Sequence, residues 1–390
     1  MKIGIAGAGI GGLAAAALLA RDGHEVDIFD QFEEPRPVGS GLVIQPVGLD
    51  VLDRIGAGDG LRALGQPLDT MFGHEARSGR TVLSVAYGEQ PERKGIGIHR
   101  AALFHLLYEA AQQAGARITP SSLVSGRSGQ HLLFGAARQG PFDLIVDACG
   151  AGSPLSPLIS RPLAYGAVWA TVPWPEQAAL PDNRLSQCYR RADRMLGVLP
   201  VGAMPDRPWQ KLAAVFYSLP VARLETWRST PFEDWKQAAE RLWPEFGPFL
   251  GWFDHHDAFT FASYTHGQLA QPWGDGIAHI GDAAHRASPQ LGQGANMALL
   301  DAAALQLALR RTSGEEALRL YAGARRWHVL AYQLMSAAFT PQYQSDSRSL
   351  PVLRDHILAP LSRMWPIPRI LTRLVCGDLV PPMPALTPRR

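Results

Sequence analysis

A glycine-rich turn near the start of the chain constrains its fold more than any other feature. Residues 2–6 form a short apolar run, residues 13–21 have the composition of a helix, and residues 25–29 form a second apolar run. The turn between the first run and the helix reads Gly7-Ala8-Gly9-Ile10-Gly11-Gly12, which fits the pattern G-x-G-x-x-G. Strand, glycine turn, helix and strand in this order predict a βαβ unit of the Rossmann type.

The glycines of this turn predict a dinucleotide site. In such a unit Gly7 permits the tight turn, Gly9 lets a pyrophosphate approach the backbone, and Gly12 lets the helix pack closely on the sheet. Asp30 ends the second strand 18 residues after Gly12, where a carboxylate accepts hydrogen bonds from a ribose diol. This acid argues against a 2′-phosphate. The motif alone does not distinguish NAD from FAD.

The rest of the chain alternates between strands and helices, with one stretch of different composition. Helices are predicted over residues 99–113, 294–311 and 315–340, and buried strands over residues 142–148 and 277–281. The stretch that differs, residues 161–273, holds eight of the ten tryptophans and two strand candidates, 195–201 and 211–218. This change predicts a separate aromatic-rich domain inserted into the first one.

A second motif, about 270 residues beyond the first, identifies the cofactor. Residues 277–296 read IAHIGDAAHRASPQLGQGAN, which places Gly281-Asp282 at a strand end, then a loop rich in Pro and Gly, then a helix that begins near Gly294. The Asp282 carboxylate can accept a hydrogen bond from a hydroxyl group of a sugar-like chain. The positive helix end suits the edge of an isoalloxazine, which becomes anionic on reduction. A simple NAD dehydrogenase has no use for this motif, so the two motifs together predict FAD.

With both motifs in this order, the chain resembles the FAD-dependent class A aromatic monooxygenases of the para-hydroxybenzoate hydroxylase and salicylate hydroxylase type, from residue 1 to about residue 345. The resemblance implies a set of cofactor-binding residues: Gly7, Gly9, Gly11, Gly12 and Asp30 at the pyrophosphate and ribose, Arg36 with Gly39, Ser40 and Gly41 in a loop over the cofactor, Arg100 at a helix start, Asp282 at the ribityl chain, and Pro289, Gly292, Gly294, Ala295 and Asn296 beside the flavin ring. His285 is expected to be structural or to lie near the flavin.

The fold class is expected to be α/β, with a Rossmann-like FAD-binding domain, an inserted β-sheet-rich substrate domain and a C-terminal helical segment. The predicted boundaries are residues 1–160 and 274–345 for the discontinuous FAD-binding domain, 161–273 for the substrate domain and 346–390 for the C-terminal segment. That segment carries Trp365 and several arginines. We expect it to pack on the FAD-binding domain, and contact with a membrane surface is the alternative.

The sequence departs from this family at a third motif. After a strand like 142–147, relatives carry Ala-Asp-Gly-x-x-Ser-x-x-Arg, whereas this chain has Cys149 at the position of the acid and Ser156 at that of the arginine. The motif is associated with both FAD and NAD(P)H binding, so the change leaves the strength and identity of the nicotinamide donor open. Cys149 is interpreted as a small buried hydrophobic residue.

The resemblance also implies a reaction. NADH or NADPH, bound transiently, reduces the flavin, O2 adds to it, and the resulting flavin C4a-hydroperoxide transfers one oxygen atom to an electron-rich aromatic ring. The catalytic side chains are unknown, because the cofactor carries the chemistry; Tyr217, Tyr264 and His266 are the substrate-side candidates. Two alternatives are a flavin oxidase or reductase without oxygen insertion and a flavoprotein with a weakened nicotinamide site.

The amino-acid composition excludes several classes of binding partner. The net charge of +2 and the 18% of charged residues do not suit a polyanion binder, so no nucleic acid partner is expected. Three cysteines without CxxC spacing suggest a reducing, cytoplasmic compartment and no metal site. The apolar run at residues 3–20 is broken by five glycines, so no integral membrane segment is expected. The expected partners are a small aromatic substrate, O2 and NAD(P)H, with a homodimer possible.

Overall fold

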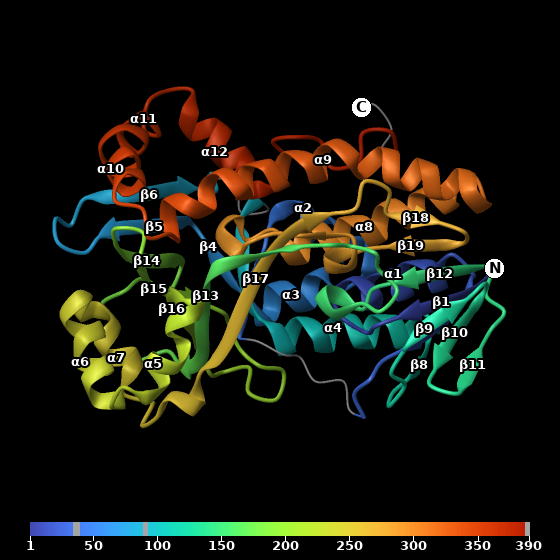
Figure 1. Cartoon of the computed structure of the whole chain (residues 1–390), viewed down its shortest axis with the longest axis horizontal. Helices are drawn as coiled ribbons and strands as arrows, with labels where there is room; N and C mark the ends of the chain where they lie inside the picture. Colours follow the sequence, from blue (N-terminus) through green and yellow to red (C-terminus); the bar gives the residue numbers. More distant parts are fainter. Residues whose placement is uncertain (34–39, 89–92, 387–390) are drawn as a thin grey trace.

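The glycine turn belongs to a six-stranded sheet at one end of the molecule (Figure 1). The computed structural model describes residues 1–33, 40–88 and 93–386. The strand order is β18 (Trp273–Gly274), β19 (Ile277–His279), β12 (Leu144–Asp147), β1 (Lys2–Ala6), β2 (Glu25–Phe29) and β8 (Arg117–Thr119). All neighbours pair in parallel except β18 and β19. The predicted strands of both motifs are therefore confirmed, and they lie in one sheet.

Different layers cover the two faces of this sheet. Helices pack on one face, with their apolar side chains in one continuous core: α1 (Ile10–Arg21), α2 (Pro46–Ile55), α3 (Gly58–Leu64), α4 (Arg100–Gln113), α8 (Gly294–Leu309) and the first part of α9 (Gly314–Tyr343). A small sheet of β9 (Gly126–Ser128), β10 (His131–Phe134) and β11 (Ala137–Gln139) covers the other face, where the Phe29 and Phe134 rings lie 5.0 Å apart. Parallel strands buried on both faces need no polar alternation, which explains their apolar sequences.

An eight-stranded sheet stands beside this first unit. Its order is β20 (His285–Arg286), β17 (Thr260–Gln268), β13 (Arg161–Pro173), β16 (Leu212–Pro220), β15 (Arg194–Pro200), β14 (Arg184–Arg190), β5 (Thr70–Glu75) and β6 (Thr81–Ala86). A three-stranded sheet of β3 (Gly41–Ile44), β7 (Gly95–His99) and β4 (Gln66–Leu68) lies next to it. The β15 and β16 strands confirm the two strand candidates of the tryptophan-rich stretch.

Three tryptophans of that stretch, Trp227, Trp235 and Trp243, pack on one face of the eight-stranded sheet. Short helices α5 (Leu224–Ser229), α6 (Phe232–Leu242) and α7 (Gly247–Leu250) cover this face. Trp227 and Trp235 meet edge to face, with ring centroids 5.6 Å apart, and Trp243 is 1% exposed. The other face of the sheet is thereby left for the C-terminal helices.

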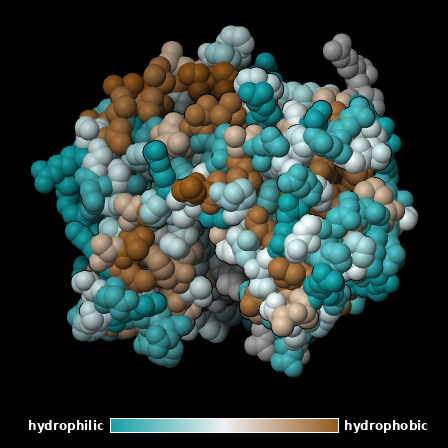
Figure 2. Space-filling model, turned by 45° about the vertical axis from the view of Figure 1, so that its right-hand side comes forward, coloured by the Kyte–Doolittle hydropathy of each residue, from teal (hydrophilic) through white to brown (hydrophobic). Residues whose placement is uncertain are grey.

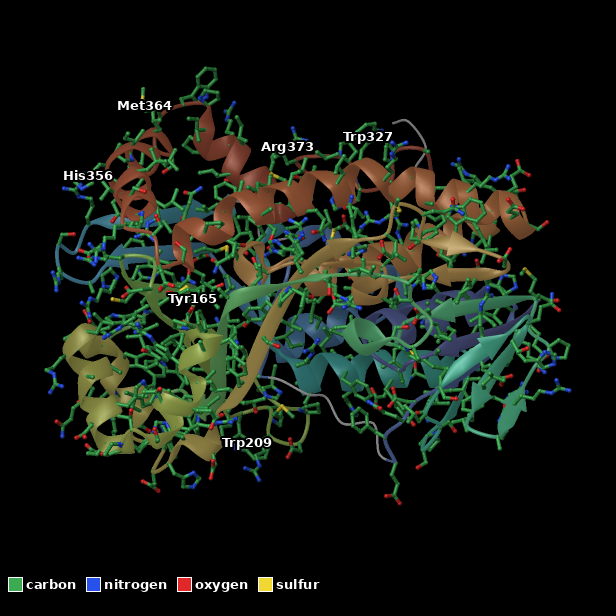
Figure 3. All side chains as sticks on the ribbon, in the orientation of Figure 1. Tyr165, Trp209, Trp327, His356, Met364 and Arg373 are labelled. Atoms are coloured by element: carbon green, nitrogen blue, oxygen red, sulfur yellow. The ribbon has the colours of Figure 1, made fainter. Side chains whose placement is uncertain are left out.

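The C-terminal helices lie over the β5–β6 end of the eight-stranded sheet, in red at the upper left of Figure 1. They are α10 (Ser349–Leu353), α11 (Ala359–Leu361) and α12 (Ile367–Cys376). Thr372 Oγ1 donates to the carbonyl of Ala86 at 2.7 Å, and Arg80 of the β5–β6 turn contacts His356, labelled in Figure 3. Gln293, before α8, also donates to Val375 O. The segment therefore packs on both units, although we expected the FAD-binding unit alone.

The sheet pairing differs from the predicted domain boundaries at β5, β6 and β20, all of which were expected in the FAD-binding domain and lie in the eight-stranded sheet. Residues 70–86 were expected within the FAD-binding domain, whereas β5 pairs in parallel with β14, with Thr70 opposite Arg184. The division of the chain into domains stays a prediction, and the sheet adds β5, β6 and β20 to the strands of residues 161–273. No helix among the described residues is long and apolar enough to cross a bilayer.

Candidate active site

The glycines of the first motif differ in how much space the protein leaves for a side chain at each position. Gly7 has a φ of +98°, and a Cβ there would lie 2.5 Å from the carbonyl oxygen of Ala148. A Cβ on Gly12 would lie 1.9 Å from the carbonyl oxygen of Gly7, so the helix could not approach the turn. A Cβ on Gly11 would touch Ala298 of α8 at 3.3 Å. The fold itself therefore requires glycine at positions 7 and 12, whereas Gly11 is only tightly packed against α8.

Gly9 is different, because no protein atom lies within 4 Å of the position of its Cβ. It is the N-cap of α1, and no side chain accepts from the helix's first N–H groups. A helix N-terminus of this kind presents unpaired donors and a partial positive charge. The turn therefore offers an open cradle for an anionic group, bounded by backbone alone.

Asp30 lies beside this cradle at the end of β2. Its Oδ2 accepts from Ala8 N at 2.8 Å and its Oδ1 accepts from Phe32 N at 3.1 Å. The carboxylate thus holds the glycine turn against the following loop. Each oxygen keeps a second lone pair, which is available to a hydroxyl group.

Asp282 and Arg100 interact electrostatically. Burial by surrounding protein raises the pKa of Asp282, although His285, Arg100 and Arg286 oppose the shift. The same desolvation lowers the pKa of Arg100, opposed by Asp282. Both side chains nevertheless keep exposed surface. The predicted ribityl acid and the predicted arginine therefore lie near each other, where a ligand can reach both.

The loop predicted to lie over the cofactor is described in part. Arg36 and Gly39 fall outside the described residues. Ser40 lies next to the site, because its carbonyl accepts from Arg100 N at 2.8 Å, and its buried Oγ has no hydrogen-bond partner in the described structure. Gly41 serves packing, since a Cβ there would lie 2.3 Å from Val201 Cγ1.

The α8 N-terminus forms the far side of the site. Pro289 begins a short turn, Gly292 follows with a φ of +61°, and the helix starts at Gly294 without a side-chain cap. A Cβ on Gly294 would meet no protein atom within 4 Å, and Ala295 is half-buried. The helix end is thus open to a ligand, as the second motif predicts.

Asn296 is predicted beside the flavin ring, and its side chain forms hydrogen bonds to backbone groups of the protein. It is fully buried; its Oδ1 accepts from Gln45 N at 2.8 Å, and its Nδ2 donates to Val43 O and Gly292 O. It ties the start of α8 to the end of β3. Its side chain has little capacity left for a ligand, so we interpret it as a structural clamp.

Sequence reasoning missed Gln45, which lies between β3 and α2. Its side chain is fully buried and interacts with the buried Tyr87 hydroxyl, but neither its Oε1 nor its Nε2 makes a hydrogen bond of good geometry among the described residues. Its Nε2 lies 3.4 Å from where a Cβ of Gly292 would be. A buried amide without partners costs free energy unless a ligand satisfies it. A glutamine at a strand end gives no sequence signal for this role.

Replacing Gln45 with leucine is expected to have opposite effects on the fold and on the site. The unpaired amide disappears, so the free energy of unfolding of the FAD-free protein should rise by about 1–2 kcal/mol. FAD affinity should fall. Gln306→Leu is the matched control, because that buried amide donates to Leu18 O and Asp22 Oδ1 and its loss should destabilise the protein. Chemical denaturation and flavin titration measure both effects; a less stable Gln45→Leu protein would contradict the assignment.

A buried polar cluster lies directly below the second motif. Asp301 of α8 accepts from the backbone of Gly281 at 2.9 Å, contacts His285 Nε2 at 2.6 Å, and accepts from Arg325 Nε at 2.8 Å. Arg325 continues to His328 and to the carbonyl of Pro382. His285 is 7% exposed, so its expected structural role agrees with its partners. The cluster fixes the turn that presents Asp282.

The third motif is rebuilt around a different acid. Asp147, fully buried at the end of β12, accepts from Cys149 N, from Ser153 Oγ and from His279 Nδ1 at 2.7 Å. Burial raises the pKa of the Cys149 thiol, which is therefore neutral. Ser156 Oγ donates to Ala283 O, which joins this loop to the second motif. The described residues hold no cluster suited to a metal ion.

The structure separates the three substrate-side candidates. Tyr264 donates nothing to a neighbour but accepts from Trp169 Nε1 at 3.0 Å, and burial raises its pKa to about 12. Trp169 packs on Phe216, with ring centroids 4.4 Å apart. Tyr217 points to the opposite face of the sheet, where it meets Trp235 edge to face. Tyr264 lies with the Trp169 and Phe216 rings on the sheet face that α5–α7 do not cover.

His266, the third candidate, lies further along the same strand. Its Nε2 is 3.2 Å from Ser336 Oγ of α9, and Ser336 in turn contacts Ser288, which precedes Pro289. Burial lowers the pKa of His266. Its ring is thus tied to α9 and the flavin-side loop.

Comparisons with known proteins agree with this geometry. The sequence model of the family described as FAD binding domain matches residues 1–127 and 167–332. The chain is 27% identical to the FAD-dependent urate hydroxylase of Klebsiella pneumoniae over 347 residues, which covers 83% of this chain and 86% of that protein. It is 25% identical to the 6-hydroxynicotinate 3-monooxygenase of Pseudomonas fluorescens over 361 residues, covering 86% and 90%.

Solved structures show the same fold. Klebsiella pneumoniae HpxO complexed with FAD and uric acid superposes with a TM-score of 0.81 at 20% identity, covering 98% of this chain and 97% of that one. The tetrameric form of 2-methyl-3-hydroxypyridine-5-carboxylic acid oxygenase superposes with a TM-score of 0.78 at 20% identity, covering 95% and 96%.

Proposed function

The chain belongs to the FAD binding domain family, and from this membership and its site we propose how it acts as a FAD-dependent aromatic monooxygenase. Enzymes of this type insert one oxygen atom from O2 into an electron-rich ring. The observation that carries the proposal is the open glycine turn at Gly9, held by Asp30 and accompanied by the exposed Asp282–Arg100 pair of the second motif.

The residues present fit FAD. The turn at Gly9 would admit a diphosphate, Asp30 would accept from ribose hydroxyls, and Asp282 would accept from the ribityl chain. The buried Ser40 Oγ and the Gln45 amide have polar atoms without partners in the described structure, which a flavin ring edge would satisfy. When bound, FAD supplies the redox chemistry, taking a hydride from NADH or NADPH and activating O2.

The protein's own groups bind, orient and exclude water. The open N-terminus of α8 stabilises negative charge beside Gly294. Arg100 adds a cation near Asp282. Trp169, Phe216 and Tyr264 supply an aromatic wall on the sheet face, which keeps water from the reacting ring.

The nicotinamide donor is bound transiently in this proposal. The chain has one G-x-G-x-x-G motif, and the third motif lacks the acid and the arginine of its relatives. Asp147 replaces the missing acid as the anchor of the loop, so the loop is ordered although its sequence differs. We keep a homodimer and a reducing, cytoplasmic setting as parts of the proposal; the three cysteines are free thiols.

An anaerobic titration with NADH and then NADPH tests the proposal. We expect the flavin band near 450 nm to bleach, and to bleach faster when an aromatic substrate is present. Turnover under labelled O2 should then place one labelled oxygen atom in the product, detected by mass spectrometry. Bleaching without label in the product would indicate an oxidase or reductase, and a flavin that neither donor reduces would indicate a weakened nicotinamide site.

A further inference from the structure

A partly enclosed cavity of about 300 Å³ lies between the eight-stranded sheet and the C-terminal helices. This volume reaches the lower end of the roughly 300–1,000 Å³ of small-molecule sites. Its walls are mainly apolar, with Met71, Val82 and Val85 from β5 and β6, and Leu371 and Val375 from α12. We call it the apolar chamber.

The apolar chamber opens on the sheet face that carries the aromatic wall. Gln187 and Tyr189 line it from β14, and strand pairing places Gln187 opposite Gly197, which in turn lies opposite Phe216. Residues paired across an antiparallel sheet point to the same face. The chamber therefore lies on the same sheet face as Phe216 and Trp169.

The apolar chamber also shares a wall with the flavin-side loop. Gln290 and Leu291 line it from the turn that precedes Gly292 and the α8 N-terminus. Gln293 Nε2 donates to Val375 O at 2.8 Å, which fixes α12 against this loop. A ring held beside the loop would therefore have the chamber directly behind it.

The lining residues of the chamber include one charged side chain, Arg354. It is 1% exposed; its Nε donates to Asp355 Oδ1 at 2.7 Å, its Nη1 donates to Gln342 O at 2.9 Å, and its guanidinium carbon lies 5.1 Å from the ring centroids of Tyr189 and Tyr343. Its Nη2 has no hydrogen-bond partner among the described residues, so it is free to donate to a neutral acceptor. Asp355 already neutralises the guanidinium, so a carboxylate beside this pair would add a second negative charge and would lose its hydration.

We propose that the apolar chamber binds an uncharged aliphatic substituent of the aromatic substrate, while the ring lies at the flavin-side loop. The inference rests on the proposed function for the oxidation of the ring. The substrate class is thereby narrowed to aromatic rings that carry an alkyl chain and no carboxylate on the chain side.

The C-terminal helices form the outer wall of the apolar chamber. Their outward side is itself apolar: Ile357 is 51% exposed, Met364 59% and Trp365 77%. Figure 2 shows hydrophobic side chains gathered at the upper left of the molecule, where Figure 1 places these helices, and Met364 points outward in Figure 3. Ile357 and Met364 lie outside the chamber lining, so they supply matched control positions.

The test measures binding to the FAD-loaded enzyme by flavin difference spectra. The probes are phenol, 4-ethylphenol, 4-butylphenol and 4-heptylphenol, a second set of 2-alkyl-4-hydroxyquinolines with the same chains, and 4-hydroxybenzoate. Burial of each methylene should lower the Kd by about fourfold. 4-Hydroxybenzoate should bind no more tightly than phenol. Equal Kd values along both sets would overturn the proposal.

Two variants fill the apolar chamber from different helices. Ala359→Phe and Leu371→Trp should reverse the gradient, so that the heptyl compounds bind at least tenfold more weakly than phenol, whose own Kd is unchanged. Ile357→Phe, on the outer side, should keep the gradient. Flavin content shows which variants retain their fold. A gradient that survives both filling changes would overturn the proposal.

The same samples separate this inference from the proposed function. Suppose that 4-hydroxybenzoate yields a labelled product but Kd does not depend on chain length. The monooxygenase activity would then be supported, and the role of the chamber in binding the chain would be contradicted. A steep dependence of Kd on chain length without labelled product would support the chamber and count against the monooxygenase.

Discussion

Replacing Gly9 with valine is expected to remove FAD from the protein while the FAD-free chain keeps its fold. Gly9 has extended backbone angles that valine tolerates, and no protein atom lies within 4 Å of its Cβ position. The branched side chain would instead fill the cradle in front of α1. Loss of two charge-assisted hydrogen bonds, at about 1.5–3 kcal/mol each, corresponds to a loss of FAD affinity of about 100-fold or more.

Gly12→Ala supplies the contrast. Its Cβ would lie 1.9 Å from Gly7 O, so the helix must move and the FAD-free protein itself should be less stable. The FAD-free form of Gly9→Val should lose at most about 1 kcal/mol, the cost of a poor N-cap. Flavin titration and denaturation of both FAD-free variants measure the two effects. Tight FAD binding by Gly9→Val would show that the diphosphate does not lie at this turn.

The sequence predicts those parts of the fold that local patterns specify. The βαβ unit, β12, β19 and α8 lie within a few residues of their predicted bounds, because apolar runs and glycine turns repeat with the period of the element. The pairing of β5 with β14 was not predicted. It joins Thr70 to Arg184, and no local pattern reports a partner so far along the chain.

The candidate site was predictable where backbone chemistry dictates the residue. Asp282 and Arg100, predicted from separate motifs, lie near enough to interact electrostatically. The bonds of the Asn296 side chain to backbone groups, and the Gln45 amide left without well-formed partners in the described structure, were not predicted. Hydrogen-bond satisfaction depends on tertiary contacts, which a sequence pattern does not contain.

Replacing Asp301 with asparagine is expected to lower the free energy of unfolding by about 3–5 kcal/mol, because it leaves a buried cation without its partner. Arg325 is 2% exposed and Asp301 is 1% exposed. Burial alone would raise the pKa of Asp301, but the charges and hydrogen bonds of His285 and Arg325 outweigh it and lower the pKa to about 2. Denaturant titrations of the FAD-free protein measure the loss.

The pH dependence has a definite sign. A carboxylate whose pKa is lowered by folding stabilises the protein above its unfolded pKa, about 3.9, and this stabilisation is lost as the pH falls through 2. Asp301→Asn should therefore remove part of the acid-induced loss of stability between about pH 4 and pH 2. An unchanged acid profile would mean that Asp301 is not ionised in the fold.

Glu315→Gln is the matched control, since Glu315 pairs with Arg319 at 2.6 Å on the surface of α9. Both side chains of this ion pair are more than half exposed, so loss of the pair should lower the free energy of unfolding by about 0–0.5 kcal/mol. Asp301 also accepts from the backbone of Gly281, next to Asp282. Its replacement should therefore weaken FAD binding as well as the fold, whereas Glu315→Gln should change neither. If Asp301→Asn loses stability but binds FAD as tightly as the wild type, the buried cluster does not position the cofactor site.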